Sequence, residues 1–368
     1  MAKSKIFSNL KRFTFGIMPS KWKSAFLAWV LTARYKPPEL VFPWNPHAIS
    51  RALVILPEDP VEAFHQIVNY MQIAVYFETA SFVIFCTGKV SAFFRYIHPE
   101  ATVIEYDVAQ RYLFSHEFDE QAKIFSKEEF DLCLVLEHAP DISLLFLAGK
   151  TAAAIRAGYT EAGAFPFLNM HINASPDKRY RSEQNCVLAR ALGATIEKKV
   201  HWSVSKEAQE EIAQMFHEFS IPSAARLVGI DVGLFYPVFG EEWTQALCNE
   251  LKKNKTFSYY CYIGEELDES VSPFAASLGL PLFSKLSAPR SAALVARSTG
   301  IISGKSIFFE LANLLKKPVI GIFEEKQSAI YCQQSAVTKA ATYSSTPDRG
   351  VIEKVVLFVN NFEAPRKA

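Results

Sequence analysis

The sequence predicts an α/β protein made of two Rossmann-like, doubly wound halves, and three observations lead to this fold class. Short apolar runs that resemble buried strands alternate with segments of helical periodicity, an order typical of a parallel sheet. The chain has 368 residues, which suits two domains of about 150 residues each. The same rhythm begins again after Pro222, so we expect a second sheet in the C-terminal half.

The first half should hold a parallel sheet with helices between its strands. Apolar runs predict strands at residues 53–56, 82–86, 103–106, 130–136 and 153–159. Apolar residues at helical spacing predict helices through 64–71, 93–97, 144–147 and 183–192. We therefore expect a buried sheet covered by helices.

The second half repeats this pattern. Its strands are predicted at 227–231, 257–263, 301–302 and 319–323, and its helices at 207–219, 242–251, 288–298 and 351–362, with one more helix ending at 278. We divide the chain into a basic arm (1–45), a first Rossmann-like domain (46–205), a linker helix and loop (206–225), a second Rossmann-like domain (226–345) and a C-terminal helix and tail (346–368). Such sheets bind ligands beyond the carboxyl ends of their strands, so we expect a cleft between the two domains.

The stretch from Ser303 to Phe323 is the strongest local signal. Ser303-Gly304-Lys305-Ser306 follows a strand and supplies the small and capping residues of a turn that opens a helix. Pro318 ends this helix before a second buried run. A helix start attracts phosphate, so the turn is a candidate phosphate site. The alternative is an ordinary strand–helix–strand unit that holds no ligand.

Composition excludes several classes of protein. The net charge is only +1, which argues against a general nucleic-acid binder. The six cysteines are scattered without a Cys-x-x-Cys pair, so we expect reduced, buried thiols and neither a zinc site nor a disulfide framework. The absence of an Asp-x-Asp motif predicts no metal cofactor. The absence of a Gly-rich fingerprint after any strand argues against a dehydrogenase.

The N-terminal arm combines basic and aromatic residues at helical spacing. Its candidate membrane-contacting residues are Lys21, Trp22, Lys23, Phe26 and Trp29. The apolar run at 25–31 is too short to span a bilayer, which takes about 20 residues, and no signal-peptide cleavage site follows it. The arm predicts an interfacial helix on anionic lipid, and hence a cytoplasmic protein on the inner face of the cytoplasmic membrane. The alternative is a helix docked on the protein's own core.

Several segments together resemble glycosyltransferase family 9, the heptosyltransferase-like enzymes of bacterial surface polysaccharide assembly. Residues 130–136 resemble the family's D-L-V-I-D-L strand, 156–159 its R-x-G-[FY] turn and 188–193 its L-L-x-x-L-G motif. Residues 293–297 resemble the helix before its nucleotide loop, and 314–323 resemble A-L-G-K-P-V-V-A-L-F. The resemblance implies the GT-B fold, a nucleotide-sugar donor bound by the second domain and a lipid-linked or polysaccharide acceptor bound by the first.

A transferase of this kind needs a base for the acceptor hydroxyl, and cations or N–H groups for the leaving diphosphate. Asp59 and Glu62 are the candidate bases; alternatively, they cap a helix and fill its first turn. The candidate donor-binding residues are Ser303, Gly304, Lys305, Ser306, Glu310 and Asp231. Among these, Glu310 would bind the ribose, or else be a surface residue near a helix start. His138 and Arg156 are the candidate acceptor-binding residues, although a lone histidine is more often structural.

The sequence departs from the family at three of its expected motifs. The family has D-[ST]-G-x-x-H between the strand and the helix of its nucleotide loop, whereas residues 305–310 here read Lys-Ser-Ile-Phe-Phe-Glu. The first loop lacks Gly-Asp, and Ile230-Asp231-Val232-Gly233 stands where H-P-G is usual. The main hypothesis is a glycosyltransferase of lipopolysaccharide or cell-envelope biosynthesis. The alternative is a non-catalytic relative that acts as a membrane-associated binding or assembly protein.

Overall fold

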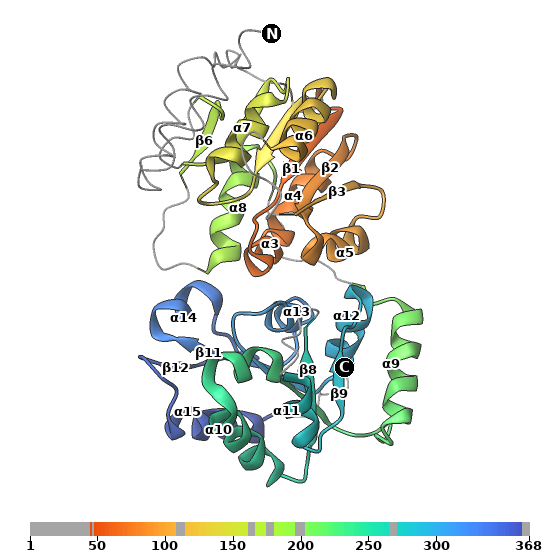
Figure 1. The fold of residues 1–368 in the computed structure, drawn as a ribbon, viewed down its shortest axis with the longest axis vertical. Coiled ribbons are helices and arrows are strands. Elements are labelled where there is room, and N and C mark those ends of the chain that lie inside the picture. Colours follow the sequence, from red (N-terminus) through yellow and green to blue (C-terminus); the bar gives the residue numbers. More distant parts are fainter. Residues whose placement is uncertain are drawn as a thin grey trace. The chain divides into compact units, whose positions relative to one another are not determined.

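The computed structural model describes residues 45, 48–107, 115–160, 166–173, 180–195, 203–264 and 271–362. These residues form two six-stranded sheets in which the strands pair in parallel (Figure 1). The strand orders are β3-β2-β1-β4-β5-β6 and β12-β11-β10-β7-β8-β9. Counted from its own first strand, each sheet has the order 3-2-1-4-5-6 that defines the Rossmann fold. The predicted fold class of two Rossmann-like sheets is confirmed.

The first sheet begins with a strand that is buried along almost its whole length. Its strands are β1 (Arg51–Ile55), β2 (Ser81–Thr87), β3 (Thr102–Tyr106), β4 (Leu132–Val135), β5 (Ile155–Tyr159) and β6 (Met170–Ile172). The accompanying helices are α3 (Pro60–His65), α4 (Ile67–Tyr76), α5 (Gly88–Ile97), α6 (His116–Lys127), α7 (Ile142–Lys150) and α8 (Arg181–Ala191). The helix predicted through 64–71 is in fact two helices, α3 and α4. The short strand β6 was not predicted.

The second sheet follows the helix α9 (Lys206–Glu218). Its strands are β7 (Leu227–Asp231), β8 (Ser258–Ile263), β9 (Leu282–Ser284), β10 (Gly300–Ser303), β11 (Val319–Glu324) and β12 (Thr338–Tyr343). Its helices are α10 (Val232–Lys252), α11 (Val271–Ser277), α12 (Ala288–Arg297), α13 (Ile307–Leu314), α14 (Glu325–Tyr331) and α15 (Arg349–Asn360). Strands β7 and β10 are buried throughout, as expected for a parallel sheet covered on both faces.

The helix α10 starts ten residues before the predicted helix at 242–251. Asp231 caps it directly at the end of β7, and Pro237 lies inside it. Gly240 interrupts it with φ 82° and ψ 173°, so two helical segments meet at a kink. Proline and glycine both disfavour a helix interior, which is why the sequence pattern revealed only the segment after the kink.

Phe362 completes the core of the second sheet from beyond α15. Its ring fills the space over Gly300, where a Cβ atom would lie 2.0 Å from a ring carbon. The guanidinium of Arg226, just before β7, packs over the ring of Phe257 at 4.5 Å from the centroid and donates a hydrogen bond to the carbonyl of Phe362. Residues from both ends of the second half therefore share one core.

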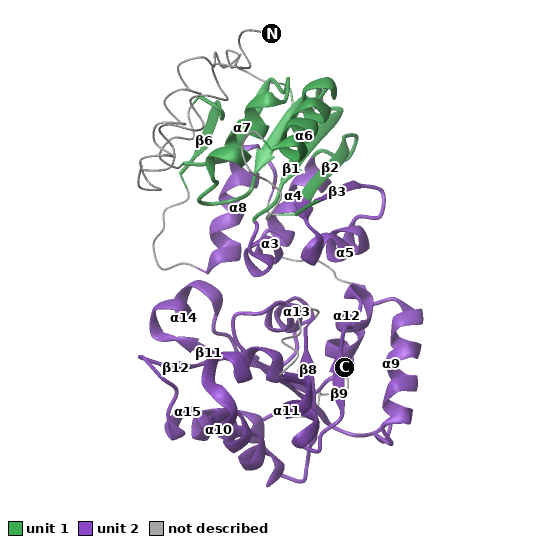
Figure 2. Ribbon diagram, viewed as in Figure 1, with its two compact units in different colours: residues 1–57, 77–85, 106–174 green, residues 58–76, 86–105, 175–368 purple. Residues whose placement is uncertain are grey.

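The contacts divide the chain into two compact units (Figure 2). Unit 1 holds residues 1–57, 77–85 and 106–174, and unit 2 holds residues 58–76, 86–105 and 175–368. Helices α3, α4 and α5 therefore belong to unit 2, together with the whole second sheet. The domain boundaries drawn from the sequence stay a prediction.

The predicted membrane-contacting residues, Lys21, Trp22, Lys23, Phe26 and Trp29, lie outside the described residues. None of the helices in the described part of the chain is both long and apolar enough to cross a membrane. The six cysteines are buried and free, as predicted.

Candidate functional site

Asp59 and Lys305, predicted as a base and a phosphate ligand, are paired with each other in unit 2. Asp59 caps α3, and its Oδ1 accepts hydrogen bonds from the N–H groups of Val61 (2.8 Å) and Glu62 (3.1 Å). Its Oδ2 accepts a hydrogen bond from Lys305 Nζ at 2.9 Å. Burial raises the pKa of Asp59, but the hydrogen bonds from Lys305 and the backbone outweigh it and lower the pKa below its usual value. Asp59 is therefore an anion at neutral pH.

Lys305 keeps its charge in this setting. Burial lowers the pKa of Lys305, whereas the hydrogen bond and the charge of Asp59 raise it by more. Its ammonium also lies over the ring of Tyr331, 4.9 Å from the centroid. The side chain is still 30% exposed. A cation that is partly exposed can exchange a carboxylate for another anion, such as a diphosphate.

Glu62, the second candidate base, is held by two other groups of unit 2. Its Oε1 accepts a hydrogen bond from the hydroxyl of Tyr331 at 2.6 Å, and its Oε2 lies 3.1 Å from Nε of Arg181 at the start of α8. Its side chain is 16% exposed, against 43% for Asp59. Asp59 is therefore the more accessible of the two carboxylates.

Three predicted donor ligands form a hydrogen-bonded triangle at the carboxyl ends of β7 and β10. Oδ2 of Asp231 accepts hydrogen bonds from Ser303 Oγ (2.6 Å) and Ser306 Oγ (2.7 Å), and the two hydroxyls lie 2.7 Å apart. Burial raises the pKa of Asp231, and the hydrogen bonds from the two serines offset only part of that rise. The triangle fixes the turn before α13 to the end of β7.

Gly304 occupies a point of close approach within this turn. A Cβ atom there would lie 2.8 Å from the carbonyl oxygen of Ile322 and 2.8 Å from the side chain of Leu234. Only glycine allows the turn to pass this close to β11. The groups of the turn that could reach a ligand are therefore the side chains of Lys305 and Ser306 and the N–H groups at the start of α13.

A pocket of about 260 Å³ opens beside this turn, within unit 2. Asp231, Lys305 and Ser306 line it together with Lys89 of α5 and Phe308 of α13. The ring of Phe308 stacks on that of Tyr262, with 4.0 Å between the centroids. An apolar wall with a few convergent polar groups is typical of a small-molecule pocket.

Glu310 lies apart from that pocket, in a buried cluster with His65 and Tyr180. Its Oε2 accepts a hydrogen bond from the hydroxyl of Tyr180 at 3.1 Å, and its Oε1 lies 3.4 Å from Nε2 of His65. Burial raises the pKa of Glu310 to about 8. Burial, together with the charges of Arg181 and Lys305, lowers the pKa of His65 to about 3. At neutral pH the acid and the imidazole are therefore both uncharged.

The two candidate acceptor ligands lie in unit 1. Arg156 is 1% exposed, and its guanidinium donates hydrogen bonds to the carbonyls of Phe167 (2.6 Å) and Ala153 (3.1 Å). His138 follows β4 and stacks on the ring of Tyr159, with 3.9 Å between the centroids. The guanidinium of Arg156 therefore stabilises the backbone near β5 through these hydrogen bonds. His138 is half-buried against an aromatic ring.

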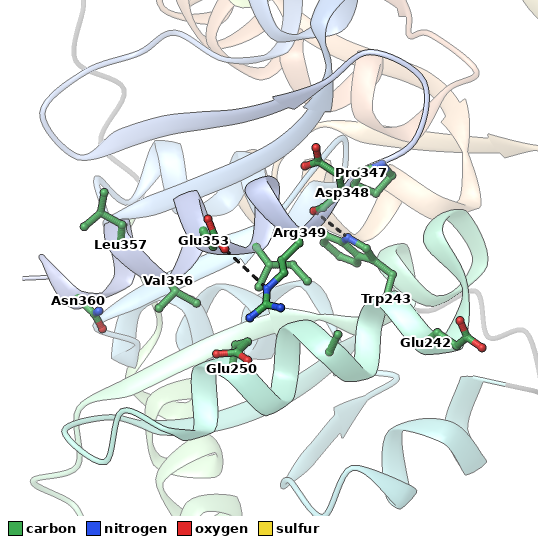
Figure 3. A pocket seen from close by; sticks show the side chains of 12 residues that line it. Glu242, Trp243, Glu250, Pro347, Asp348, Arg349, Glu353, Val356, Leu357 and Asn360 are labelled. Atoms are coloured by element: carbon green, nitrogen blue, oxygen red, sulfur yellow. Dashed lines mark hydrogen bonds and ion pairs between the residues drawn. The ribbon is translucent and has the colours of Figure 1, made fainter.

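A further hollow of about 740 Å³ lies between α10 and α15 (Figure 3). Trp243, Glu250 and Arg349 line it, and none of the residues that the sequence singled out does. Within the described ranges, no group of three or more His, Cys, Asp or Glu side chains is placed to hold a metal ion.

No protein-family model and no curated protein matches the sequence. Among solved structures, the glycosyl transferase family 9 protein from Veillonella parvula matches with a TM-score of 0.71 and 14% identity, over 86% of this chain and 98% of that chain. ADP-heptose lps heptosyltransferase II of E. coli matches with a TM-score of 0.66 and 14% identity, over 85% and 98%. E. coli heptosyltransferase WaaC with ADP matches with a TM-score of 0.64 and 14% identity, over 85% of this chain and 100% of that chain.

The chain has the GT-B fold of the heptosyltransferases. The resemblance to glycosyltransferase family 9 that the sequence motifs indicated is confirmed as a structural similarity. At 14% identity this similarity establishes the GT-B fold and not the donor or the acceptor.

Sequence reasoning missed four residues of the site, namely His65, Tyr180, Arg181 and Tyr331. A single histidine or tyrosine carries no local signal, and each of these residues acquires its role through contacts between distant elements. One signal was present, because Glu62 and His65 lie three residues apart and so share a face of α3, next to its N-cap Asp59.

Proposed function

We propose that this protein is a heptosyltransferase-like glycosyltransferase. It would move a sugar from a nucleotide-activated donor to a lipid-linked or cell-envelope glycan, as in lipopolysaccharide biosynthesis. The observation that carries the proposal is the 260 Å³ pocket in which Lys305 and Ser306 meet the capped starts of α10 and α13, beside the carboxylate of Asp59. The GT-B fold supports it, because one structure with this fold is heptosyltransferase WaaC with ADP.

The diphosphate of the donor would lie at the start of α13. Lys305 supplies a full positive charge, and the N–H groups after Ser306 supply hydrogen bonds and the positive end of the helix dipole. These groups stabilise the charge that develops on the leaving diphosphate more than they stabilise the bound donor. They therefore favour departure of the nucleotide.

Asp59 would accept the proton of the acceptor hydroxyl. In the free protein its Oδ2 is occupied by Lys305, so the carboxylate is a weaker base than a free one. A diphosphate that draws the Lys305 ammonium away leaves Oδ2 open and raises the basicity of Asp59. Donor binding would thus prepare the base for the acceptor.

The second candidate is a non-catalytic relative, and one observation favours it. The polar groups of the site already form hydrogen bonds with one another. Lys305 donates to Asp59, and Ser303 and Ser306 donate to Asp231. The loop also lacks the acid and the histidine of the family motif. Such a protein would keep the fold for binding or assembly at the membrane.

Titration calorimetry of the full chain with ADP, UDP, GDP and ADP-sugars separates the two candidates. A transferase should bind at least one of them, and a ligand at a hundred times its dissociation constant should add about 2.7 kcal/mol to the free energy of unfolding. If calorimetry and thermal shift both detect none of these ligands, the transferase proposal fails and the non-catalytic relative stands.

The basic arm would hold the protein on the inner face of the cytoplasmic membrane. Its lysines and aromatic residues, Trp22, Phe26 and Trp29 among them, suit an anionic interface. The full chain should pellet with phosphatidylglycerol-containing vesicles and dissociate in high salt, whereas a chain starting at Pro43 should not pellet. Equal pelleting of both chains would exclude this role of the arm.

A further inference from the structure

A cavity of about 740 Å³ in unit 2 takes no part in the proposed transfer. Residues of helices α3, α4, α8 and α13 and of the segment 333–338 line it. Its volume lies within the range of about 300–1,000 Å³ that small-molecule pockets have. Lys305, Ser306 and Asp231 line the smaller pocket instead, so the cavity is separate from the candidate diphosphate site.

Two buried polar side chains in the cavity wall have atoms without a hydrogen-bond partner, although Oε2 of Glu310 is bonded to Tyr180. His65 is 2% exposed and Glu310 is 4% exposed. Both ring nitrogens of His65 and Oε1 of Glu310 have no hydrogen-bond partner among the described residues; Nε2 and Oε1 lie 3.4 Å apart without forming a hydrogen bond. Buried polar groups in native proteins are nearly always hydrogen-bonded. Three orphan atoms in one cavity wall therefore point to a ligand that supplies the partners.

The charge of the cavity wall restricts the chemistry of that ligand. His65 and Glu310 are uncharged at neutral pH, because burial lowers the pKa of the imidazole and raises that of the acid. The charges of Arg181 and Lys305 act on His65, but neither side chain lines the cavity, so a phosphate or carboxylate bound there would lose water without direct contact with either cation. The two basic side chains that line the cavity, Arg190 and Lys316, are exposed and lie at its rim.

Most of the remaining polar lining residues offer hydrogen bonds without charge; the exception is Glu183, whose carboxylate accepts a hydrogen bond from the amide of Gln333. Side-chain hydroxyls and amides recur on three of the lining segments, namely those of Ser182, Asn313, Gln333, Ser335 and Thr338. A wall of neutral donors and acceptors suits a ligand with several hydroxyl groups, each of which donates and accepts.

We propose that this cavity binds a neutral sugar ring of a glycan, with hydroxyl groups of the ring bonded to His65 and Glu310. The site is new relative to the proposed transfer, and it stands whether or not Lys305 binds a nucleotide. The ribose of a nucleoside is the competing source of the same hydroxyl chemistry. The experiment must therefore distinguish a free saccharide from a nucleoside.

Saturation-transfer NMR on the full chain tests this, because it detects weak ligands. The probes are glucose, galactose, N-acetylglucosamine and a heptose, each at millimolar concentration, with adenosine and uridine in parallel samples. At least one saccharide should receive saturation from the wild type, and that signal should persist when adenosine or uridine is added to the same sample. A signal from a nucleoside alone, or no signal from any saccharide, overturns the proposal.

Matched variants locate the binding. Glu310→Gln should bind like the wild type, since an amide replaces a carboxyl that is already neutral, whereas Glu310→Leu should lose most of the signal. Ser182→Trp places a bulky side chain at the cavity wall on α8 and leaves His65 and Glu310 unchanged, so it should also abolish the signal even if Glu310→Leu fails to fold. Lys305→Ala should leave saccharide binding unchanged.

Saccharide binding that survives both Glu310→Leu and Ser182→Trp places the ligand elsewhere and overturns the proposal. Loss of nucleotide binding in Lys305→Ala bears only on the proposed transfer.

Discussion

Nζ of Lys305 lies 2.9 Å from Oδ2 of Asp59, although the two residues are 246 positions apart in the chain. The ion pair joins the turn before α13 to the N-cap of α3 within unit 2. A half-exposed pair of this kind contributes little to stability, about 0–1 kcal/mol. The ion pair matters because each partner has a separate proposed role. Asp59 can act as the base, and Lys305 can bind the diphosphate, only when the ion pair between them is broken.

Lys305→Ala should weaken the binding of nucleoside diphosphates. A charge-assisted contact contributes about 1.5–3 kcal/mol, which corresponds to roughly a ten- to hundredfold loss of affinity at 1.4 kcal/mol per tenfold. Calorimetric titration of the wild type and the variant measures it. Lys326→Ala, which removes an exposed lysine of α14, is the control and should leave the affinity unchanged. Similar affinities for all three proteins would exclude Lys305 as a phosphate ligand.

Asp59→Asn should lower turnover while preserving the helix cap. The amide oxygen can still accept the N–H groups of Val61 and Glu62, but the residue cannot take a proton. Loss of a general base lowers the rate by about 10²–10⁴-fold. Donor affinity should rise, because Lys305 no longer has a carboxylate partner.

The matched control for this change is Asp348→Asn, which alters the N-cap of α15 in the same way. It should reproduce any loss of stability and none of the loss of turnover. If Asp59→Asn transfers sugar at the wild-type rate, then the base is another residue.

The buried pair His65 and Glu310 should give the free energy of unfolding a pH dependence with two limbs. Burial lowers the pKa of His65 from 6.5 to about 3, so the stability it contributes is present above pH 6.5 and is lost as the pH falls toward 3. Burial raises the pKa of Glu310 from 4.5 to about 8, so its contribution is present below pH 4.5 and is lost as the pH rises through 8. Together they predict a plateau between pH 4.5 and 6.5.

Glu310→Gln should remove the alkaline limb, and His65→Gln the acid limb. The slope of either limb is at most about 1.4 kcal/mol per pH unit. Urea unfolding of the wild type and both variants across the pH range measures the free energy of unfolding. Subtracting a variant's curve from the wild-type curve removes the contributions of the other titrating groups. A Glu310→Gln curve that runs parallel to the wild-type curve from pH 5 to 8 would show that Glu310 ionises normally.

Arg156→Met should destabilise the protein, whatever the acceptor is. The change leaves the carbonyls of Phe167 and Ala153 without their side-chain donors, in residues that are fully buried. Each orphaned group costs about 1–3 kcal/mol, so the melting temperature should fall by several degrees. Arg349→Met, at an exposed position of α15, is the control. An unchanged melting temperature for Arg156→Met would return Arg156 to the list of ligand-binding candidates.

The sheets were predictable because their central strands are short, continuous apolar runs, as in β7 and β11. The strand β12 (Thr338–Tyr343) escaped prediction because it is an edge strand that contains lysine and two alanines, residues that are depleted in strands. The kinked helix α10 was only half visible, because Pro237 and Gly240 break its pattern.

Several individual residues of the site could be predicted from the sequence, but not which of them contact one another. Asp59 and Lys305 each carry a local signal, namely a helix cap and a turn, yet nothing local indicates that they meet. Glu310 shows the same limit more sharply. Its position in the first turn of α13 is typical of a surface residue, and only the packing of α3 and of Tyr180 against that turn makes it buried and neutral.

The placement of Phe362 over Gly300 has a consequence for biosynthesis. The second sheet cannot close its core until the ribosome has translated Phe362, because that ring fills the gap over β10 and its carbonyl binds Arg226. The last strand of the first sheet ends at Ile172, so that sheet can assemble much earlier on the nascent chain. Between those two moments, strands β7 to β11 leave the exit tunnel with apolar surface uncovered. This interval is when a nascent chain most needs a chaperone, and a stall placed just before Phe362 should prolong it.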